Sequence, residues 1–146
     1  MNQAGSSSYS ERSRAREMLV QSLYQMQLTD HGKDELLSQF RDRPEYSKID
    51  QQYFDELLVK IYDNWSDLQK KLEQYVDIPI SQMDPVELAI LILGYQELES
   101  QLDIPFRVII DEAINLAKTF GSVDGFKYIN AVLDRVVRKL RSSELQ

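Results

Sequence analysis

The chain has 146 residues, a length that suits one domain. Hydrophobic residues make up 42% and charged residues 28%, as in a soluble globular protein, and five glycines and four prolines are too few for a turn-rich β-sandwich or barrel. There is no cysteine and only one histidine, which excludes disulfides, zinc sites built on sulfur and sites that need two imidazoles.

The net charge of −7 is unevenly distributed. Residues 1–29 sum to +1, residues 30–112 to −11 and residues 113–146 to +3. Salt confines the influence of each patch to about 10 Å, so this asymmetry matters more to the choice of partner than the total does. The chain has no apolar run of membrane length and no secretory signal, which predicts a cytoplasmic protein that contacts no membrane.

Residues 1–10 are small and polar, and we expect them to be a disordered tail that precedes one domain over residues 11–146. From Arg12 an apolar stripe with helical spacing predicts a first helix, which ends at the turn Asp30-His31-Gly32. A short second helix is expected before Arg43-Pro44. The apolar residues of these two helices are Ala15, Met18, Leu19, Leu23 and Met26, then Leu36, Leu37 and Phe40.

The most regular segment has an apolar side chain at alternating steps of four and three residues. Its members are Phe54, Leu58, Ile61, Trp65, Leu68, Leu72 and Tyr75. This heptad-like spacing predicts a single long helix from about Asp50 to Val76, one wall of a bundle.

Three further helices are expected after this one. Asp84 can cap the next helix, Pro85 suits its first position and Glu87 stands at the capping-box position. The uniformly apolar run 88–93 predicts that this helix is buried near the centre. A helix then opens at Ile104-Pro105 and has Gly121 as its C′ residue, and the last helix begins near Asp124. The apolar faces of these last two helices are Ile109, Ala113, Leu116, Ala117 and Phe120, then Phe126, Ile129, Leu133, Val136, Val137 and Leu140. The sequence therefore predicts an all-α protein of six or seven helices.

The sequence lacks the phosphate-binding loops, nucleophile elbow, zinc-protease motif and calcium loop that mark common enzyme classes. Asp111-Glu112, with Glu97 and Glu99, are the only suggestion of paired carboxylates, and we interpret them as a solvated helix face. We therefore expect no catalytic residue, no metal and no cofactor.

Two features are candidates for binding an anion. Arg12, Arg14 and Arg16 open the predicted first helix, where guanidinium groups can bind phosphates and stack on unpaired bases, although a solvated surface is the commoner role of such a run. The segment 121–130 contains the start of the last helix, where Lys127 and Tyr128 can hold a phosphate and stack a base. The alternative is a capped turn with Tyr128 partly in the core.

Together these features resemble the family of the transcription antitermination factor NusB. The resemblance rests on Arg14 to Glu17 with Val20 to Tyr24, on Val86 to Leu91 with Tyr95, Glu97 and Leu98, and on Ile104 to Gly121 with Lys127 to Asp134. The chain departs from the family pattern in having Asp111 where Asn is usual, Ala131 where Gly is usual, and only three arginines in its N-terminal run.

The resemblance implies two three-helix subbundles and a non-catalytic role. It implies that the protein binds single-stranded boxA RNA of ribosomal RNA leaders together with the small-subunit ribosomal protein NusE, within the RNA polymerase antitermination complex. Family positions that contact RNA correspond here to Arg12, Arg14, Arg16, Asp124, Lys127 and Tyr128. Tyr24 and Glu87 correspond to positions of the RNA and protein-partner surface. The acidic middle of the chain then suits a basic ribosomal protein, or serves only solubility.

Two alternatives remain at this point. The same fold occurs as an accessory domain of RNA methyltransferases, which needs a methyl-donor-binding domain that these 146 residues do not contain. The other alternative is a homodimeric helical scaffold with no role in RNA binding, and dimer formation can mask an RNA surface.

Overall fold

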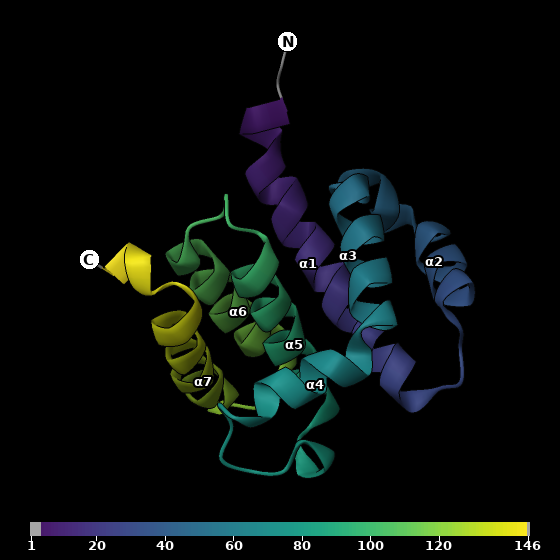
Figure 1. Ribbon diagram of the computed structural model, residues 1–146. Helices are drawn as coiled ribbons and strands as arrows, with labels where there is room; N and C mark the ends of the chain where they lie inside the picture. The colour runs from purple at the N-terminus through teal and green to yellow at the C-terminus, as the bar shows by residue number, and fades with distance from the viewer. Residues whose placement is uncertain (1–3, 146) are drawn as a thin grey trace. The chain divides into compact units, whose positions relative to one another are not determined.

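The computed structural model describes the backbone of residues 4–145 and the side chains of residues 9–145 (Figure 1). The described residues form seven α-helices, three short 3₁₀ helices and no strand, which confirms the all-α prediction. Internal contacts divide the chain into two compact units, residues 1–63 and residues 64–146. Each unit is described by itself below.

The N-terminal unit contains α1 (Ala4–Leu28), α2 (Lys33–Arg41), the 3₁₀ helix η1 (Pro44–Lys48) and α3 (Gln51–Asp63). Each of its three α-helices packs against the other two. The apolar faces predicted for the first two helices are buried here, with Leu19, Leu23, Leu36 and Phe40 fully enclosed. The ring of Phe40 lies beside that of Phe54 on α3, at 6.2 Å between centroids.

The first helix begins earlier than the sequence predicts. α1 starts at Ala4, so the described part of the expected disordered tail, residues 4–10, is helical, and residues 1–3 lie outside the described residues. Extending a helix that already exists adds one hydrogen bond for each residue fixed, whereas starting one is unfavourable, so even a serine-rich segment can continue α1. As a consequence Arg12 lies two turns inside the helix.

The long helix predicted from Asp50 to Val76 is wrong, because the chain forms two helices there, α3 and α4 (Trp65–Glu73). Asn64 leaves the helical region at φ −116° and ψ 20°, and its carbonyl accepts the N–H of Leu68 at 2.8 Å. Asp63 and Asn64 are poor helix formers, since their short polar side chains compete for backbone hydrogen bonds. The apolar spacing continues through the break, and Phe54, Leu58, Leu68 and Leu72 are all buried.

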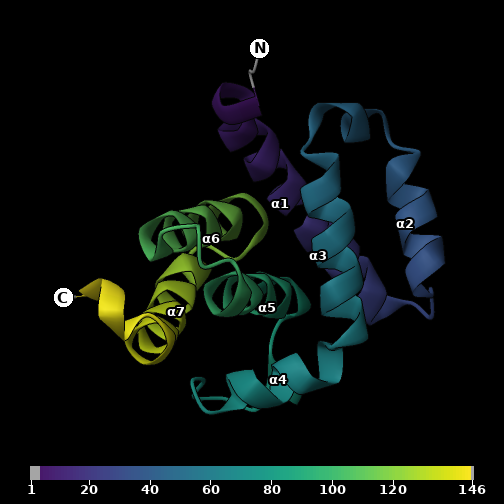
Figure 2. The ribbon, with the colours of Figure 1, turned by 45° about the horizontal axis from the view of Figure 1, so that its top comes forward.

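The C-terminal unit contains α4, η2 (Ile80–Gln82), α5 (Pro85–Ser100), α6 (Phe106–Phe120), α7 (Gly125–Leu140) and η3 (Ser142–Leu145). α5 packs against α4, α6 and α7, and Figure 2 shows it lying among them. Because neighbours cover it on three sides, every residue from 88 to 98 is buried, as the uniformly apolar run predicts.

The predicted cap and first residue of α5 are confirmed, whereas the carboxylate of Glu87, expected at the capping-box position, accepts from the Ser122 hydroxyl. Asp84 Oδ2 accepts the backbone N–H groups of Val86 and Glu87, each at 3.1 Å, and Pro85 occupies the first helical position. The inner faces of α6 and α7 are also as predicted, except that Phe120, Phe126 and Leu140 are only half-buried. Among the residues that the structure describes, none of the helices combines the length and apolar character of a membrane crossing.

A buried arginine holds the end of α5, and the sequence analysis did not identify it. Arg141 is 3% exposed, and its guanidinium donates to four backbone carbonyls at 2.8–3.3 Å and to the carboxylate of Glu144. The acceptor carbonyls belong to Glu97, Leu98, Gln101 and Ile104. The hydrogen bond from Arg141, with a second from the Phe106 N–H, lowers the pKa of Glu144 below its ordinary value.

Candidate functional site

The three arginines singled out in the sequence have different surroundings on α1. Arg12 is half-buried; its guanidinium lies 4.4 Å from the ring centroid of Tyr53 and 3.4 Å from Asp50 Oδ2. Asp50 Oδ1 also accepts the N–H of Tyr53 at 3.1 Å, and the Asp50 N–H donates to the Glu11 carbonyl at 3.0 Å. The start of α3 therefore fixes Arg12 in place.

Arg16 lies in the interior rather than on the surface. It is 1% exposed, and its guanidinium lies 5.6 Å from the same Tyr53 ring. The sequence analysis groups Arg16 with the arginines that can bind phosphates, but its position is within the buried stripe of a helix that packs on α3. An arginine can occupy such a place because its flat guanidinium stacks on an aromatic ring.

Arg14 is exposed and borders a small pocket of about 250 Å³ within the N-terminal unit. The pocket lies between one face of α1 and the segment 45–49. Of the three predicted arginines, Arg14 is therefore the one whose guanidinium is fully available at the surface.

The turn between α6 and α7 contains the second group of predicted residues. Gly121 ends α6 with an extended backbone, φ −93° and ψ −173°, and its N–H donates to the Ala117 carbonyl at 2.8 Å. A Cβ at Gly121 would lie 2.7 Å from that same carbonyl oxygen, so close approach, rather than a left-handed conformation, requires glycine here.

The carboxylate of Glu87, at the start of α5, reaches this turn. Its Oε2 accepts a hydrogen bond from the Ser122 hydroxyl at 3.1 Å, and a Cβ at Gly125 would lie 2.5 Å from the same oxygen. The structure thus brings Glu87, predicted for the partner surface, together with the turn predicted for RNA. The sequence predicts both but not their contact, because 35 residues separate Glu87 from Ser122.

Asp124 and Lys127 are both exposed, with 75% and 70% of their side chains accessible. Asp124 Oδ1 lies 3.5 Å from Lys127 Nζ. α7 begins after Asp124, as predicted, but the Asp124 side chain makes no capping hydrogen bond, and at φ −108° and ψ 8° its backbone lies outside the extended region typical of such caps. Asp124 instead places a negative charge beside Lys127.

Tyr128 is half-buried, and its hydroxyl is buried with no hydrogen-bond partner among the residues that the structure describes. Its ring therefore lies partly in the core, as the alternative for this turn anticipated. Next to it, the ring of Phe126 has Lys118 Nζ 4.9 Å from its centroid. The turn thus combines two aromatic rings with two lysines, a composition suited to stacking and phosphate binding.

The predicted residues belong to both units. Arg12, Arg14, Arg16 and Tyr24 lie in the N-terminal unit, and Tyr24 is 39% exposed on α1. Glu87, Asp124, Lys127 and Tyr128 lie in the C-terminal unit. Within the N-terminal unit, Arg12 and Arg16 lie against Tyr53 and Arg14 is exposed. Within the C-terminal unit, the four residues lie at the α6–α7 turn and the start of α5.

The carboxylates considered for acid–base chemistry are not one solvated face. Glu97 and Glu112 are 1% and 6% exposed, so for them that interpretation is wrong, since α5 and α6 pack into the core there. Asp111 is exposed, and Glu99 accepts from Lys71 Nζ at 3.0 Å, which raises the pKa of Lys71. Among the described residues, no group of three or more acidic or histidine side chains is arranged to hold a metal ion.

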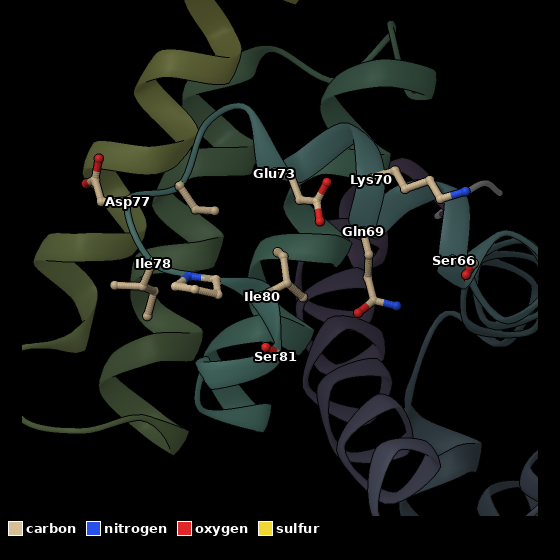
Figure 3. Close-up of a pocket in the computed structure, with 10 residues that line it drawn as sticks. Ser66, Gln69, Lys70, Glu73, Asp77, Ile78, Ile80 and Ser81 are labelled. Carbon is tan, nitrogen blue, oxygen red and sulfur yellow. The ribbon is translucent and has the colours of Figure 1, made fainter.

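A second pocket, of about 650 Å³, lies in the C-terminal unit between α4 and the loop that leads to η2. In Figure 3, Gln69 and Glu73 extend from α4 toward the same space as Ile80. Ile78, at the other end of the pocket, is exposed. The apolar and polar side chains that line this pocket do not form a nucleophile paired with a base.

The sequence analysis did not identify Tyr53, which lies against Arg12 and Arg16, or Asp50, which pairs with Arg12. Tyr53 is adjacent to one of the regularly spaced apolar residues of its segment but is not one of them, and Asp50 marks the predicted start of a helix. No local signal indicates them, because 38 residues separate Arg12 from Asp50.

Comparison with known proteins places these observations in a family. The model of the NusB family matches residues 13–138. A transcription antitermination protein NusB of Pseudomonas savastanoi pv. phaseolicola is 41% identical over 136 residues, which are 93% of this chain and 82% of that protein. The corresponding protein of Paraburkholderia phymatum is 42% identical over 137 residues, 94% of each chain. The solved structure of T. maritima NusB has a TM-score of 0.80 at 25% identity and covers 92% of this chain and 96% of that one.

Proposed function

The chain belongs to the NusB family, and on that premise we propose that it is a transcription antitermination factor that binds the boxA element of ribosomal RNA leaders as single-stranded RNA. The observation that carries this proposal is the match to proteins named for transcription antitermination along more than nine-tenths of the chain. These relatives are named for that role and not for an enzymatic reaction, in agreement with the expectation of a non-catalytic protein.

In this proposal the phosphates of the RNA are contacted by the accessible cations. Arg14 is exposed, Arg12 is half-buried with its charge near the surface, and Lys127 is exposed at the α6–α7 turn. Tyr128 offers the accessible side of its ring to a base. Arg16 acts indirectly, because it is buried against the Tyr53 ring on which Arg12 also lies.

The proposed protein partner is the small-subunit ribosomal protein NusE, in the antitermination complex of RNA polymerase and in the cytoplasm. Tyr24 and Glu87 are our candidates for its surface. Residues 30–112 sum to −11, and an acidic surface attracts a basic ribosomal protein while it repels RNA from the wrong face. Glu87 lies against the turn that carries Lys127, so one partner on Glu87 would border the RNA.

A direct binding measurement tests the proposal. A fluorescently labelled single-stranded boxA RNA is titrated with the wild type, Arg14→Ala, Asp124→Asn and the control Arg138→Ala, in which an exposed arginine of α7 is removed. We expect Arg14→Ala to weaken binding about tenfold, as for a hydrogen-bonded charge. Asp124→Asn should tighten binding about twofold to fivefold, since it removes a carboxylate 3.5 Å from Lys127.

The control Arg138→Ala should leave the affinity unchanged, although it alters the net charge by the same amount as Arg14→Ala. Wild-type protein that binds boxA RNA no better than an unrelated RNA of equal length would contradict the proposal. Sedimentation with and without the RNA, and with NusE, reports whether a homodimer competes with the complex.

A further inference from the structure

The pocket beside Arg14 has the form of a site for a single unpaired nucleobase. It is lined from α1 by Arg14, Glu17, Met18 and Gln21 and from the other side by Glu45, Lys48 and Ile49. The four α1 residues are spaced by three, one and three, so they share one face of the helix. Its volume of about 250 Å³ is below the range of about 300–1,000 Å³ typical of sites for drug-sized ligands.

The floor of the pocket is apolar and its rim is polar. Met18 and Ile49 line the pocket and are buried, so they form an apolar floor against which a base can pack. Arg14, Glu17, Glu45 and Lys48 are exposed around them. A base with its face on Met18 and Ile49 would therefore meet only polar groups at its edges.

The rim supplies each kind of contact that a nucleotide makes. The planar guanidinium of Arg14 can stack on a base, whereas the ammonium group of Lys48 suits a phosphate. The carboxylates of Glu17 and Glu45 accept hydrogen bonds from an exocyclic amino group, as acidic residues do from cytosine. The amide of Gln21 is held in place, because its Oε1 accepts from Arg43, whose guanidinium lies 4.0 Å from the ring centroid of Phe40.

We propose that this pocket, formed by α1 and residues 45–49, binds one unstacked base of the RNA, and that it prefers a base with an exocyclic amino group. The inference rests on the proposed function and adds to it a base-reading site, separate from the phosphate contacts. Two carboxylates at the rim disfavour a free phosphate as the occupant, since they offset the charges of Arg14 and Lys48.

A scan with abasic nucleotides tests the proposal. Each base of the boxA RNA is removed in turn, and the affinity of each RNA is measured for the wild type, Arg14→Lys, Glu45→Gln and Lys48→Ala. Arg14→Lys keeps the charge but removes the flat stacking group, and Glu45→Gln keeps the size of the side chain but removes its charge. Two matched controls carry the same changes away from the pocket, Arg138→Lys and Lys60→Ala.

We expect one position at which removal of the base weakens wild-type binding about fivefold or more, the lower end of what one stacked base contributes. That penalty should shrink in Arg14→Lys and Glu45→Gln and persist in both controls. Lys48→Ala should weaken binding of every RNA by a similar factor, whereas Lys60→Ala should not. Replacing the responding base with uracil should reproduce most of the loss.

Two results would overturn the inference. One is a wild type that binds boxA RNA but shows no sensitive position; the other is a sensitive position whose penalty is the same in the pocket variants. Both leave the proposed function intact, because the wild type still binds the RNA. Absence of RNA binding by the wild type contradicts the proposed function itself. Melting temperatures of all variants establish that each is folded.

Discussion

The guanidinium of Arg141 lies inside the C-terminal unit, beneath the end of α5. Arg141 donates to the carbonyls of Glu97, Leu98 and Gln101 at the end of α5 and to that of Ile104 beyond it. The carbonyls of Glu97 and Gln101 also accept backbone N–H groups, from Gln101 and Ile104, so Arg141 is a second donor to them. A flat group with five N–H donors suits this arrangement better than an ammonium group does. This side chain therefore fixes the turn between α5 and α6.

Replacement of Arg141 tests this role. Arg141→Met keeps much of the side-chain volume but removes the guanidinium donor from the buried carbonyls of Leu98 and Ile104, so we expect it to lower the free energy of unfolding by about 3–5 kcal/mol. Arg141→Lys should lose less, because three donors remain. Chemical denaturation followed by circular dichroism measures both. Equal stability of Arg141→Met and the wild type would show that the carbonyls find other donors.

The hydroxyl and the ring of Tyr128 can be tested separately by two single substitutions. Its hydroxyl is buried without a partner among the described residues, so Tyr128→Phe should raise the free energy of unfolding by about 1 kcal/mol and preserve RNA affinity. Tyr128→Ala should lower the melting temperature and, if the ring stacks on a base, weaken RNA binding by about 1–3 kcal/mol. Melting temperature and boxA affinity are measured side by side. If folded Tyr128→Ala binds boxA RNA as tightly as the wild type does, the ring contributes to the core and not to RNA binding.

At the level of the helices, one glycine lies at the start of α2 and another at the end of α6, for different reasons. Gly121 has no room for a Cβ beside Ala117, whereas nothing lies within 4 Å of a Cβ at Gly32. Gly32 precedes α2 with φ −78° and ψ 174°, the extended backbone typical of an N-cap, and makes no side-chain cap. The two positions therefore respond oppositely to substitution.

We expect Gly121→Ala to lower the free energy of unfolding by about 1–3 kcal/mol, because the new methyl group meets backbone that cannot move aside. Gly32→Ser should raise it by about 0.5–1 kcal/mol, through a new cap and reduced freedom of the unfolded chain. Thermal unfolding of the two variants beside the wild type checks both signs. A neutral Gly121→Ala would mean that the α6–α7 turn shifts at little cost.

For the molecule as a whole, the distribution of charge decides how an acidic protein binds RNA. The chain has a net charge of −7, yet the described α1 and α6–α7 turn carry accessible cations. Four cations are proposed to contact phosphates: Arg12, Arg14, Lys48 and Lys127. Because so few cations contact phosphates, the affinity for RNA depends only weakly on salt concentration.

We therefore predict that the logarithm of the boxA affinity falls with the logarithm of salt concentration with a slope of about −3, since each phosphate contact to single-stranded RNA contributes about −0.7. Lys127→Ala should reduce the magnitude of the slope by about 0.7. Titrations at several potassium chloride concentrations measure it. A slope several times steeper would mean that further cations contact the RNA.

The sequence by itself determined the fold class, the number of helices and most of the core. Short-range patterns carry this information: the apolar spacing of α2, α6 and α7 and the Asp84-Pro85 start of α5 act within a few residues of themselves. The same patterns could not locate the break at Asn64, because the apolar spacing runs through it unchanged.

Only the tertiary structure decided which predicted site residues are accessible. Arg12, Arg14 and Arg16 look equivalent in the sequence, but α3 brings Tyr53 and Asp50 against two of them and leaves Arg14 at the surface. The contact of Glu87 with Ser122 and the hold of Arg141 on α5 likewise join residues at least 35 positions apart. A guanidinium or a carboxylate takes its role from the groups that packing places around it, and local sequence does not specify those groups.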